Sequence, residues 1–131
     1  MTHRLEIRVY YEDTDLAGIV YYANYLKFIE RARSEWVREL GVDQRRLKAD
    51  DGTVFAVRRI EADYLRPACF DDLLVVETSM VRMSTARLVL DQAVLRGDTR
   101  LFEAEVTLVA LSAEGRPVRL PAEFRRKLEG A

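Results

Sequence analysis

One amphipathic helix followed by an unbroken series of strand patterns is the feature of this sequence that most limits its fold. Between Tyr22 and Leu40, apolar residues recur every three or four positions and charged residues fill the other sides, which predicts a helix. From Thr53 onward, apolar and polar residues alternate in segments separated by short turns, which is typical of antiparallel neighbours. This order predicts an α+β domain in which a curved antiparallel sheet wraps around one long helix.

Capping and turn-forming residues predict where the elements begin and end. Leu5, Ile7 and Val9 alternate with charged residues in a first strand, and Asn24 and Gly41 are the expected N-cap and stop of the long helix. The other expected elements are a helical turn at 45–49, strands at 54–65, 73–83, 87–96 and around 102–110, a short last strand at Val118, and a helix at 122–129.

The length and charge of the chain limit its organisation and its partners. A chain of 131 residues suits a single domain over residues 1–131. Its 21 basic and 22 acidic residues give a net charge of -1, which argues against a general nucleic-acid binder. No apolar run approaches the roughly 20 residues of a membrane span, and the first ten residues do not read as a signal peptide. We therefore expect a cytoplasmic location.

The scarcity of histidine and cysteine excludes several kinds of chemistry. His3 is the only histidine, which disfavours a histidine-assisted nucleophile and the usual zinc sites. Cys69 is the only cysteine, so the chain forms no internal disulfide, and we expect Cys69 to be a small packing residue. No glycine-rich phosphate loop is present, and no pattern indicates a metal or bound cofactor. The remaining candidate for catalysis is a carboxylate side chain.

Two carboxylates, Asp13 and Asp15, lie between the first predicted strand and the long helix. A helix N-terminus presents unpaired N–H groups and a partial positive charge, so the N–H groups around residues 21–24 are candidate donors to a developing oxyanion. A carboxylate beside such donors suits acyl hydrolysis. The alternative from these residues alone is that both aspartates only stabilise the loop.

The segment from Arg8 to Tyr25, which reads RVYYEDTDLAGIVYYANY, resembles the signature of the 4-hydroxybenzoyl-CoA thioesterase family. It is most similar to the branch of short acyl-CoA thioesterases associated with the Tol-Pal envelope system. The resemblance continues at 28–35, at 63–68 and at 71–73, and so spans most of the chain. It implies the hotdog fold, an antiparallel sheet wrapped around a long central helix.

The resemblance also implies roles for individual residues. The family's catalytic aspartate falls on Asp15, and its backbone oxyanion donor falls on the N–H of Tyr22. Gly18, Ile19 and Val20 would shape the turn and bind substrate. Basic residues near the turn at 83–86 can contact CoA phosphates in this family, and here Arg82 and Arg87 flank that turn. The alternative is that both are solvated arginines of the turn, and Arg58, Arg59 and Arg66 are weaker candidates for the same contact. The family's active sites form between subunits, which implies a homodimer or homotetramer.

One residue departs from the most similar branch, which commonly has histidine at the position of Tyr22, whereas the aromatic-substrate branch has tyrosine. A backbone donor survives this exchange, but an imidazole acid or base does not. The Tyr22 ring either lines an acyl pocket or packs on the apolar face of the helix.

Three functions therefore remain at the level of the sequence. The first is an acyl-CoA thioesterase, whose substrate is either CoA-linked or linked to acyl carrier protein. The second is a hotdog hydratase or dehydratase, which generally needs a histidine in its site. The third is a non-catalytic scaffold or acyl-thioester binding protein at the envelope.

Overall fold

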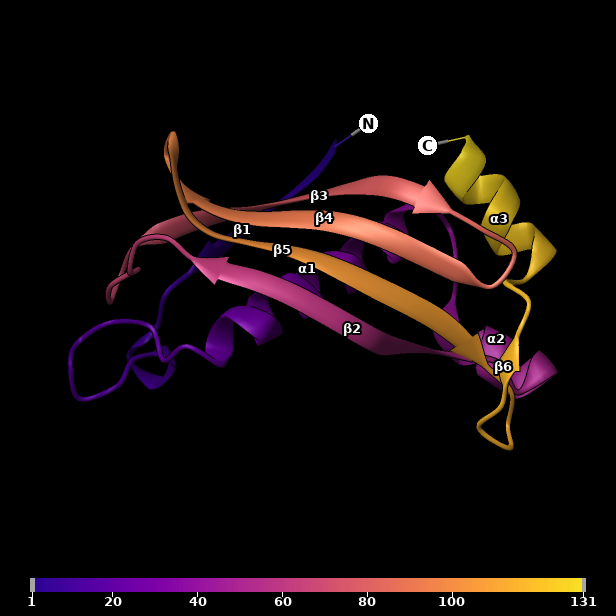
Figure 1. Ribbon diagram of the computed structural model, residues 1–131. Coiled ribbons are helices and arrows are strands. Elements are labelled where there is room, and N and C mark those ends of the chain that lie inside the picture. The colour runs from indigo at the N-terminus through magenta and orange to yellow at the C-terminus, as the bar shows by residue number, and fades with distance from the viewer. Residues whose placement is uncertain (1, 131) are drawn as a thin grey trace.

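The sheet curves around helix α1 in the computed structural model, which describes residues 2–130 (Figure 1). It is antiparallel, with strands in the order β1-β3-β4-β5-β2 and with β6 paired to β5. The strands are β1 (Thr2–Arg8), β2 (Val54–Tyr64), β3 (Leu73–Met83), β4 (Arg87–Arg96), β5 (Thr99–Leu111) and β6 (Pro117–Val118). The helices are η1 (Tyr11–Asp13, a 3-10 turn), α1 (Asn24–Glu39), α2 (Gln44–Asp51) and α3 (Ala122–Glu129).

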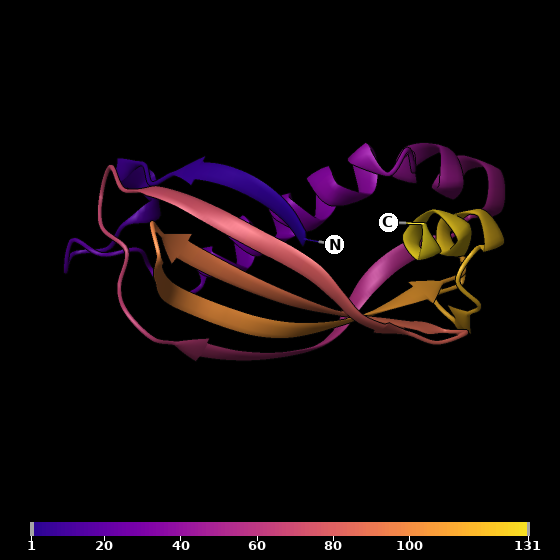
Figure 2. The same ribbon diagram turned by 90° about the horizontal axis from the view of Figure 1, so that it is seen from above.

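Helix α1 packs its apolar side against one face of this sheet, as Figure 2 shows from above. Phe28, Ile29 and Ala32 are fully buried there, because their three- and four-residue spacing places them on one side of the helix. They belong to a core cluster with Leu74, Val76, Val94 and Phe102 of the sheet. The predicted hotdog architecture is therefore confirmed.

A second core cluster fills the other half of the molecule, around the C-terminal end of α1. Trp36 and Val37 of α1 lie in it with Leu90 of β4 and with Phe124 and Leu128 of α3. Helix α3 thus closes the end of the sheet that the first cluster does not fill.

Most predicted elements are confirmed, with one wrong cap. The strands at 73–83 and 87–96 and the helix at 122–129 have the expected bounds, and the predicted turn at 45–49 extends to the longer α2. Asn24 is not the N-cap of α1. It is the first helical residue, Ala23 precedes it as the cap, and the Asn24 side chain instead donates to the carbonyl of Asp13 at 2.9 Å.

The two ends of the sheet carry different loops (Figure 1). The segment between β1 and α1 lies at one end with the β2–β3 connection, to which it is hydrogen bonded. The β3–β4 turn, α2 and α3 lie at the other end. In the described part of the chain, no helix has both the length and the apolar character needed to cross a membrane.

Candidate active site

Asp15 lies in a tight turn between η1 and α1. Its backbone N–H donates to the carbonyl of Ile19 at 2.9 Å, and the N–H of Gly18 donates to the carbonyl of Asp15 at 2.9 Å. Gly18 has a φ of 81°, in the left-handed region that a residue without a Cβ adopts most readily. The Asp15 carboxylate accepts one bond, from the N–H of Ala17 at 2.9 Å, and no other donor reaches it among residues 2–130.

The β2–β3 connection holds this turn in place. The N–H of Val20 donates to the carbonyl of Ala68 at 2.8 Å, and Ile19 pairs with Cys69 in an isolated bridge. The N–H of Ala68 in turn donates to the hydroxyl of Tyr25, in the first turn of α1, at 3.0 Å. One short segment therefore positions both the Asp15 turn and the beginning of the helix.

Asp13 has a structural role. Its carbonyl accepts from the N–H of Tyr21 at 2.9 Å and from the Asn24 side chain, and its carboxylate accepts from the N–H of Tyr10 at 2.8 Å. These bonds fix the path of the chain from η1 into α1, so of the two aspartates Asp15 is the one whose carboxylate remains available for chemistry in the pocket.

A pocket of about 380 Å³ opens where the Asp15 turn, the start of α1 and the end of β2 meet. Most of its wall is apolar or aromatic, and two charged residues reach it. The lining residues are Asp15, Ile19, Val20, Tyr21, Tyr22, Tyr25, Tyr64, Leu65, Arg66 and Pro67. A largely apolar pocket with a few polar groups suits a small organic ligand.

The chain leading into α1 contributes backbone donors to this region. The N–H of Asn24 donates to the carbonyl of Tyr21 at 2.8 Å. The N–H groups of Tyr22 and Ala23 have no acceptor within residues 2–130. Such unpaired N–H groups, together with the positive end of the helix dipole, favour negative charge nearby. Asp15 and Tyr22 thus both line one pocket, and the N–H of Tyr22 has no acceptor within residues 2–130.

Three tyrosine hydroxyls of the pocket hold their protons more tightly than usual. The pKa of Tyr21 is raised by its hydrogen bond to and interaction with Tyr22, then by burial and by the charge of Asp15. Burial raises the pKa of Tyr25, and burial followed by Tyr22 raises the pKa of Tyr64. All three stay protonated at neutral pH and are able to donate hydrogen bonds.

The structure brings together part of the predicted site. Ile19, Val20 and Tyr22 line the pocket with Asp15, whereas Gly18 forms the turn behind it. Tyr22 is 61% exposed and lines this pocket, and it does not belong to either core cluster.

Arg82 and Arg87 do not lie near this pocket within one chain. They flank the β3–β4 turn, at the end of the sheet opposite to the Asp15 turn (Figure 1). Arg66 is the arginine that lines the pocket.

Several pocket residues are absent from the predicted site, chiefly Tyr21, Tyr25, Tyr64 and Pro67, and Arg66 is predicted only as a weaker candidate for a phosphate contact. Tyr64 and Pro67 lie in segment 63–68, which carries part of the family resemblance, so that segment was the available signal. Cys69 beside it is exposed, so the expectation that it is a packing residue is wrong: its backbone pairs with Ile19 at the edge of the connection, away from the core.

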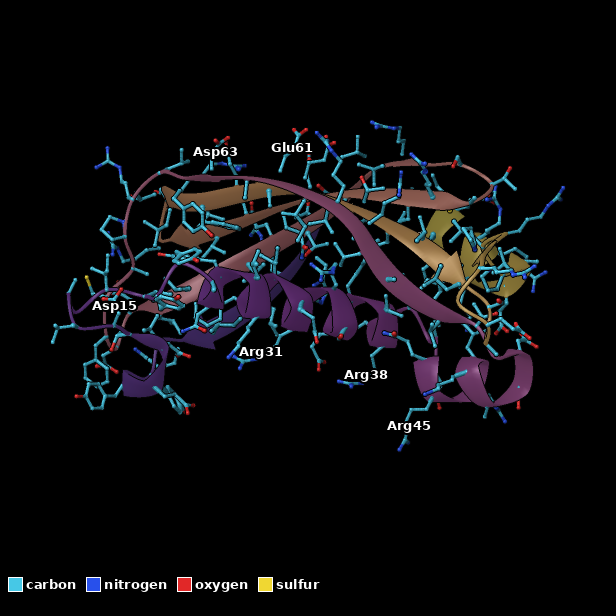
Figure 3. All side chains as sticks on the ribbon, turned by 60° about the horizontal axis from the view of Figure 1, so that its bottom comes forward. Asp15, Arg31, Arg38, Arg45, Glu61 and Asp63 are labelled. Atoms are coloured by element: carbon cyan, nitrogen blue, oxygen red, sulfur yellow. The ribbon has the colours of Figure 1, made fainter. Side chains whose placement is uncertain are left out.

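The outer face of the sheet offers a larger hollow, of about 450 Å³, with unsuitable chemistry. Glu105 lies directly opposite both Asp91 and Glu61 across its neighbouring strands. Figure 3 shows that Glu61 and Asp63 project from the face of the sheet that points away from α1. Arg31 and Arg38 project from α1 on the opposite side of the molecule, and Asp15 lies at one end. So many carboxylates repel an anionic ligand.

No metal site is evident in the described chain. Among residues 2–130, no three His, Cys, Asp or Glu side chains gather in a way that could hold a metal ion. His3 pairs with Glu39 at the C-terminal end of α1, whereas Asp15 precedes its N-terminal end.

Comparison with known proteins agrees with this architecture. The model of the thioesterase superfamily matches residues 17–103. The chain is 40% identical to the acyl-CoA thioester hydrolase YbgC of Escherichia coli O6:H1 over 94% of this chain and 96% of that protein. It is 38% identical to the acyl-CoA thioesterase YbgC of Haemophilus influenzae over 91% of this chain and 88% of that protein.

A solved structure also resembles this chain over most of its length. The crystal structure of a probable thioesterase from Bartonella henselae superimposes with a TM-score of 0.89 at 39% identity, covering 92% of this chain and all of that one. The family model covers α1, β2 and the β2–β3 connection, and two relatives named acyl-CoA thioesterase or thioester hydrolase match nearly the whole chain. This chain therefore belongs to the thioesterase superfamily.

Proposed function

We propose that this protein is an acyl-CoA thioesterase, which hydrolyses an acyl-CoA thioester to a free acid and CoA. The observation that carries the proposal is that Asp15 and Tyr22 line the same largely apolar pocket, and that the N–H of Tyr22 is unpaired within residues 2–130. The relatives named acyl-CoA thioesterase, which match nearly the whole chain, support the substrate class.

In the proposed reaction Asp15 supplies the carboxylate. Acting as a general base, it takes a proton from water while the water oxygen bonds to the thioester carbonyl carbon. The resulting oxyanion accepts a hydrogen bond from the N–H of Tyr22, a donor of a kind worth about 2.7–4 kcal/mol to a transition state. Collapse then breaks the C–S bond, and the CoA thiolate takes the proton from Asp15.

Direct attack by Asp15 is the second route. The carboxylate oxygen then bonds to the carbonyl carbon and expels the thiolate, and water opens the mixed anhydride that forms. Single-turnover hydrolysis in ¹⁸O-labelled water, followed by mass analysis of the peptide containing Asp15, tests this route: label in the Asp15 carboxylate indicates the anhydride.

We further propose a homodimer formed through β2. This strand pairs with β5 on one side, and no described strand covers its other edge, which is a ready template for a second copy. Antiparallel pairing of β2 with its own copy brings the partner subunit's β3–β4 turn to the end of the assembly that holds the pocket. Arg82 and Arg87 would then reach CoA phosphates from the other subunit.

The test is thiol release from short, long and aromatic acyl-CoAs, and from an acyl carrier protein thioester, by the wild type and by Asp15→Asn. Asp15→Asn keeps the shape of the side chain and its acceptor for Ala17, so we expect a folded protein that has lost nearly all hydrolysis. Wild-type turnover by a folded Asp15→Asn protein contradicts the proposal.

A non-catalytic scaffold or binding protein is the alternative. None of the described residues or named relatives supports it over hydrolysis, and a wild type silent on every thioester of the panel is the result that would favour it.

A further inference from the structure

Tyr64, the last residue of β2, connects the edge strand to the beginning of α1. Its hydroxyl donates a hydrogen bond to the backbone carbonyl of Tyr22 at 2.9 Å, across 42 residues of sequence. Its ring packs edge-on against Tyr25 and Phe102, with centroids 5.6 and 5.0 Å away. The hydroxyl is therefore held at a fixed position by ring contacts with the core.

The carbonyl that Tyr64 binds is one that the helix itself leaves free. Tyr22 precedes Ala23, the N-cap of α1, so its carbonyl lies outside the hydrogen bonds of the helix itself. Here the N–H of Leu26 donates to Ala23 at 3.2 Å, in the tighter 3-10 manner. Among residues 2–130, the Tyr64 hydroxyl is the donor to the Tyr22 carbonyl, so a side chain from the sheet holds a carbonyl that the helix does not use.

The bonds on either side of Tyr22 fix the direction of its N–H. The preceding residue is anchored by the bond from the N–H of Tyr21 to Asp13, at 2.9 Å. The following peptide group, which joins the Tyr22 carbonyl to the N–H of Ala23, is anchored by Tyr64. An oxyanion donor is effective only when it already points to where the negative charge develops.

We infer that Tyr64 is a positioning residue for the oxyanion site, acting through the backbone of Tyr22 without touching the reacting atoms. The inference rests on the proposed function. Because burial raises the pKa of Tyr64, its hydroxyl remains a donor throughout the neutral range.

Tyr64→Phe tests the inference, because it removes the hydroxyl and keeps the ring contacts with Tyr25 and Phe102. We expect kcat for acyl-CoA hydrolysis to fall about 3- to 10-fold, the effect of one neutral hydrogen bond, with KM changed less than about twofold. Tyr11→Phe is the matched control, since it removes the hydroxyl of a tyrosine that is 82% exposed and does not line the pocket. It should leave kcat unchanged.

An amide NMR spectrum gives a second readout that does not depend on activity. In Tyr64→Phe the amide signal of Ala23 should shift, because that N–H shares a peptide group with the Tyr22 carbonyl. The same signal should stay in place in Tyr11→Phe.

The outcomes separate this inference from the proposed function. Wild-type kcat in Tyr64→Phe, while Asp15→Asn is inactive, overturns the positioning role and leaves the thioesterase proposal standing. An active Asp15→Asn protein overturns the proposed function itself. A Tyr64→Phe protein in which KM rises as much as kcat falls also contradicts the inference, because a residue that only orients an oxyanion donor affects the transition state selectively.

Discussion

The side-chain amide of Gln92 donates a hydrogen bond to the backbone carbonyl of Ile29 at 2.9 Å, joining β4 to α1 inside the core. The same nitrogen also donates to the hydroxyl of Thr78 at 2.9 Å, and the Gln92 carbonyl oxygen accepts from Arg33 at 2.9 Å. Gln92 is 2% exposed, yet both its nitrogen and its oxygen have partners. This arrangement is what allows a polar side chain to lie between helix and sheet.

Replacing Gln92 by Leu should therefore destabilise the fold although the volume is similar. The hydroxyl of Thr78 and the guanidinium of Arg33 lose a buried partner, which costs about 1–3 kcal/mol of unfolding free energy. Urea denaturation measures the change. Gln92→Glu, which keeps the acceptor for Arg33, is the comparison variant, and a Leu variant as stable as the wild type contradicts the argument.

Asp72 should make the stability of the β2–β3 connection depend on pH. Burial acts to raise the pKa of Asp72, but the N–H of Cys69 and the guanidinium of Arg96, both at 2.8 Å, bring it below its ordinary value. A lowered pKa in the folded state means that the carboxylate stabilises the fold above about pH 4, and that this contribution is lost as the pH falls through the folded-state pKa.

We expect Asp72→Asn to lower the unfolding free energy by about 1 kcal/mol at pH 7. The value is modest because the Asp72 side chain is 23% exposed and that of Arg96 is 41% exposed. The difference from the wild type should shrink below about pH 4. Urea titrations at pH 7 and pH 3 measure it, and an equal difference at both pH values would contradict this assignment.

Substitutions at Gly18 should change the unfolding free energy according to how well the new residue tolerates a positive φ. A Cβ added at Gly18 meets no atom within 4 Å, so the penalty comes from its positive φ. Gly18→Val should lose about 1–2 kcal/mol of unfolding free energy, and Gly18→Asn clearly less, because asparagine tolerates the left-handed region. Thermal unfolding compares the two, and equal losses would show that the conformation at Gly18 is not the cause.

Arg82 and Arg87 should affect binding of the nucleotide part of CoA. With both replaced by Ala, KM for an acyl-CoA should rise about tenfold, the loss of roughly 1.4 kcal/mol of phosphate binding. KM for the same acyl group on N-acetylcysteamine, which carries no phosphate, should stay constant. Arg4→Ala removes a positive charge at the outer face, where Arg4 pairs with Glu77, and is the control.

Mixed subunits test whether these arginines act across the proposed dimer. A heterodimer of Asp15→Asn with the Arg82→Ala, Arg87→Ala chain contains one site with an intact Asp15 and the partner's intact arginines. Its kcat/KM should exceed that of either parent homodimer. If kcat/KM does not rise on mixing, the arginines act on the site of their own chain.

The sequence by itself determined the local structure of this protein. The three- and four-residue spacing in α1 and the alternation in β3 and β4 predict those elements because each pattern follows from the geometry of a single helix or strand. The one wrong cap shows the limit of this reasoning. Asn24 has the right residue type for an N-cap, but its side chain binds the carbonyl of Asp13, which folding brings close.

Only the tertiary structure decided which distant residues share a pocket. Tyr64 and Arg66 join Asp15 because the end of β2 lies beside the start of α1, and Arg82 and Arg87 do not, because they flank a turn at the opposite end of the sheet. Periodicity assigns a residue to one face of its own strand, but the order of strands in the sheet depends on contacts between residues far apart in the chain. The composition of the pocket therefore follows from the packing of α1 against the sheet, which no local pattern specifies.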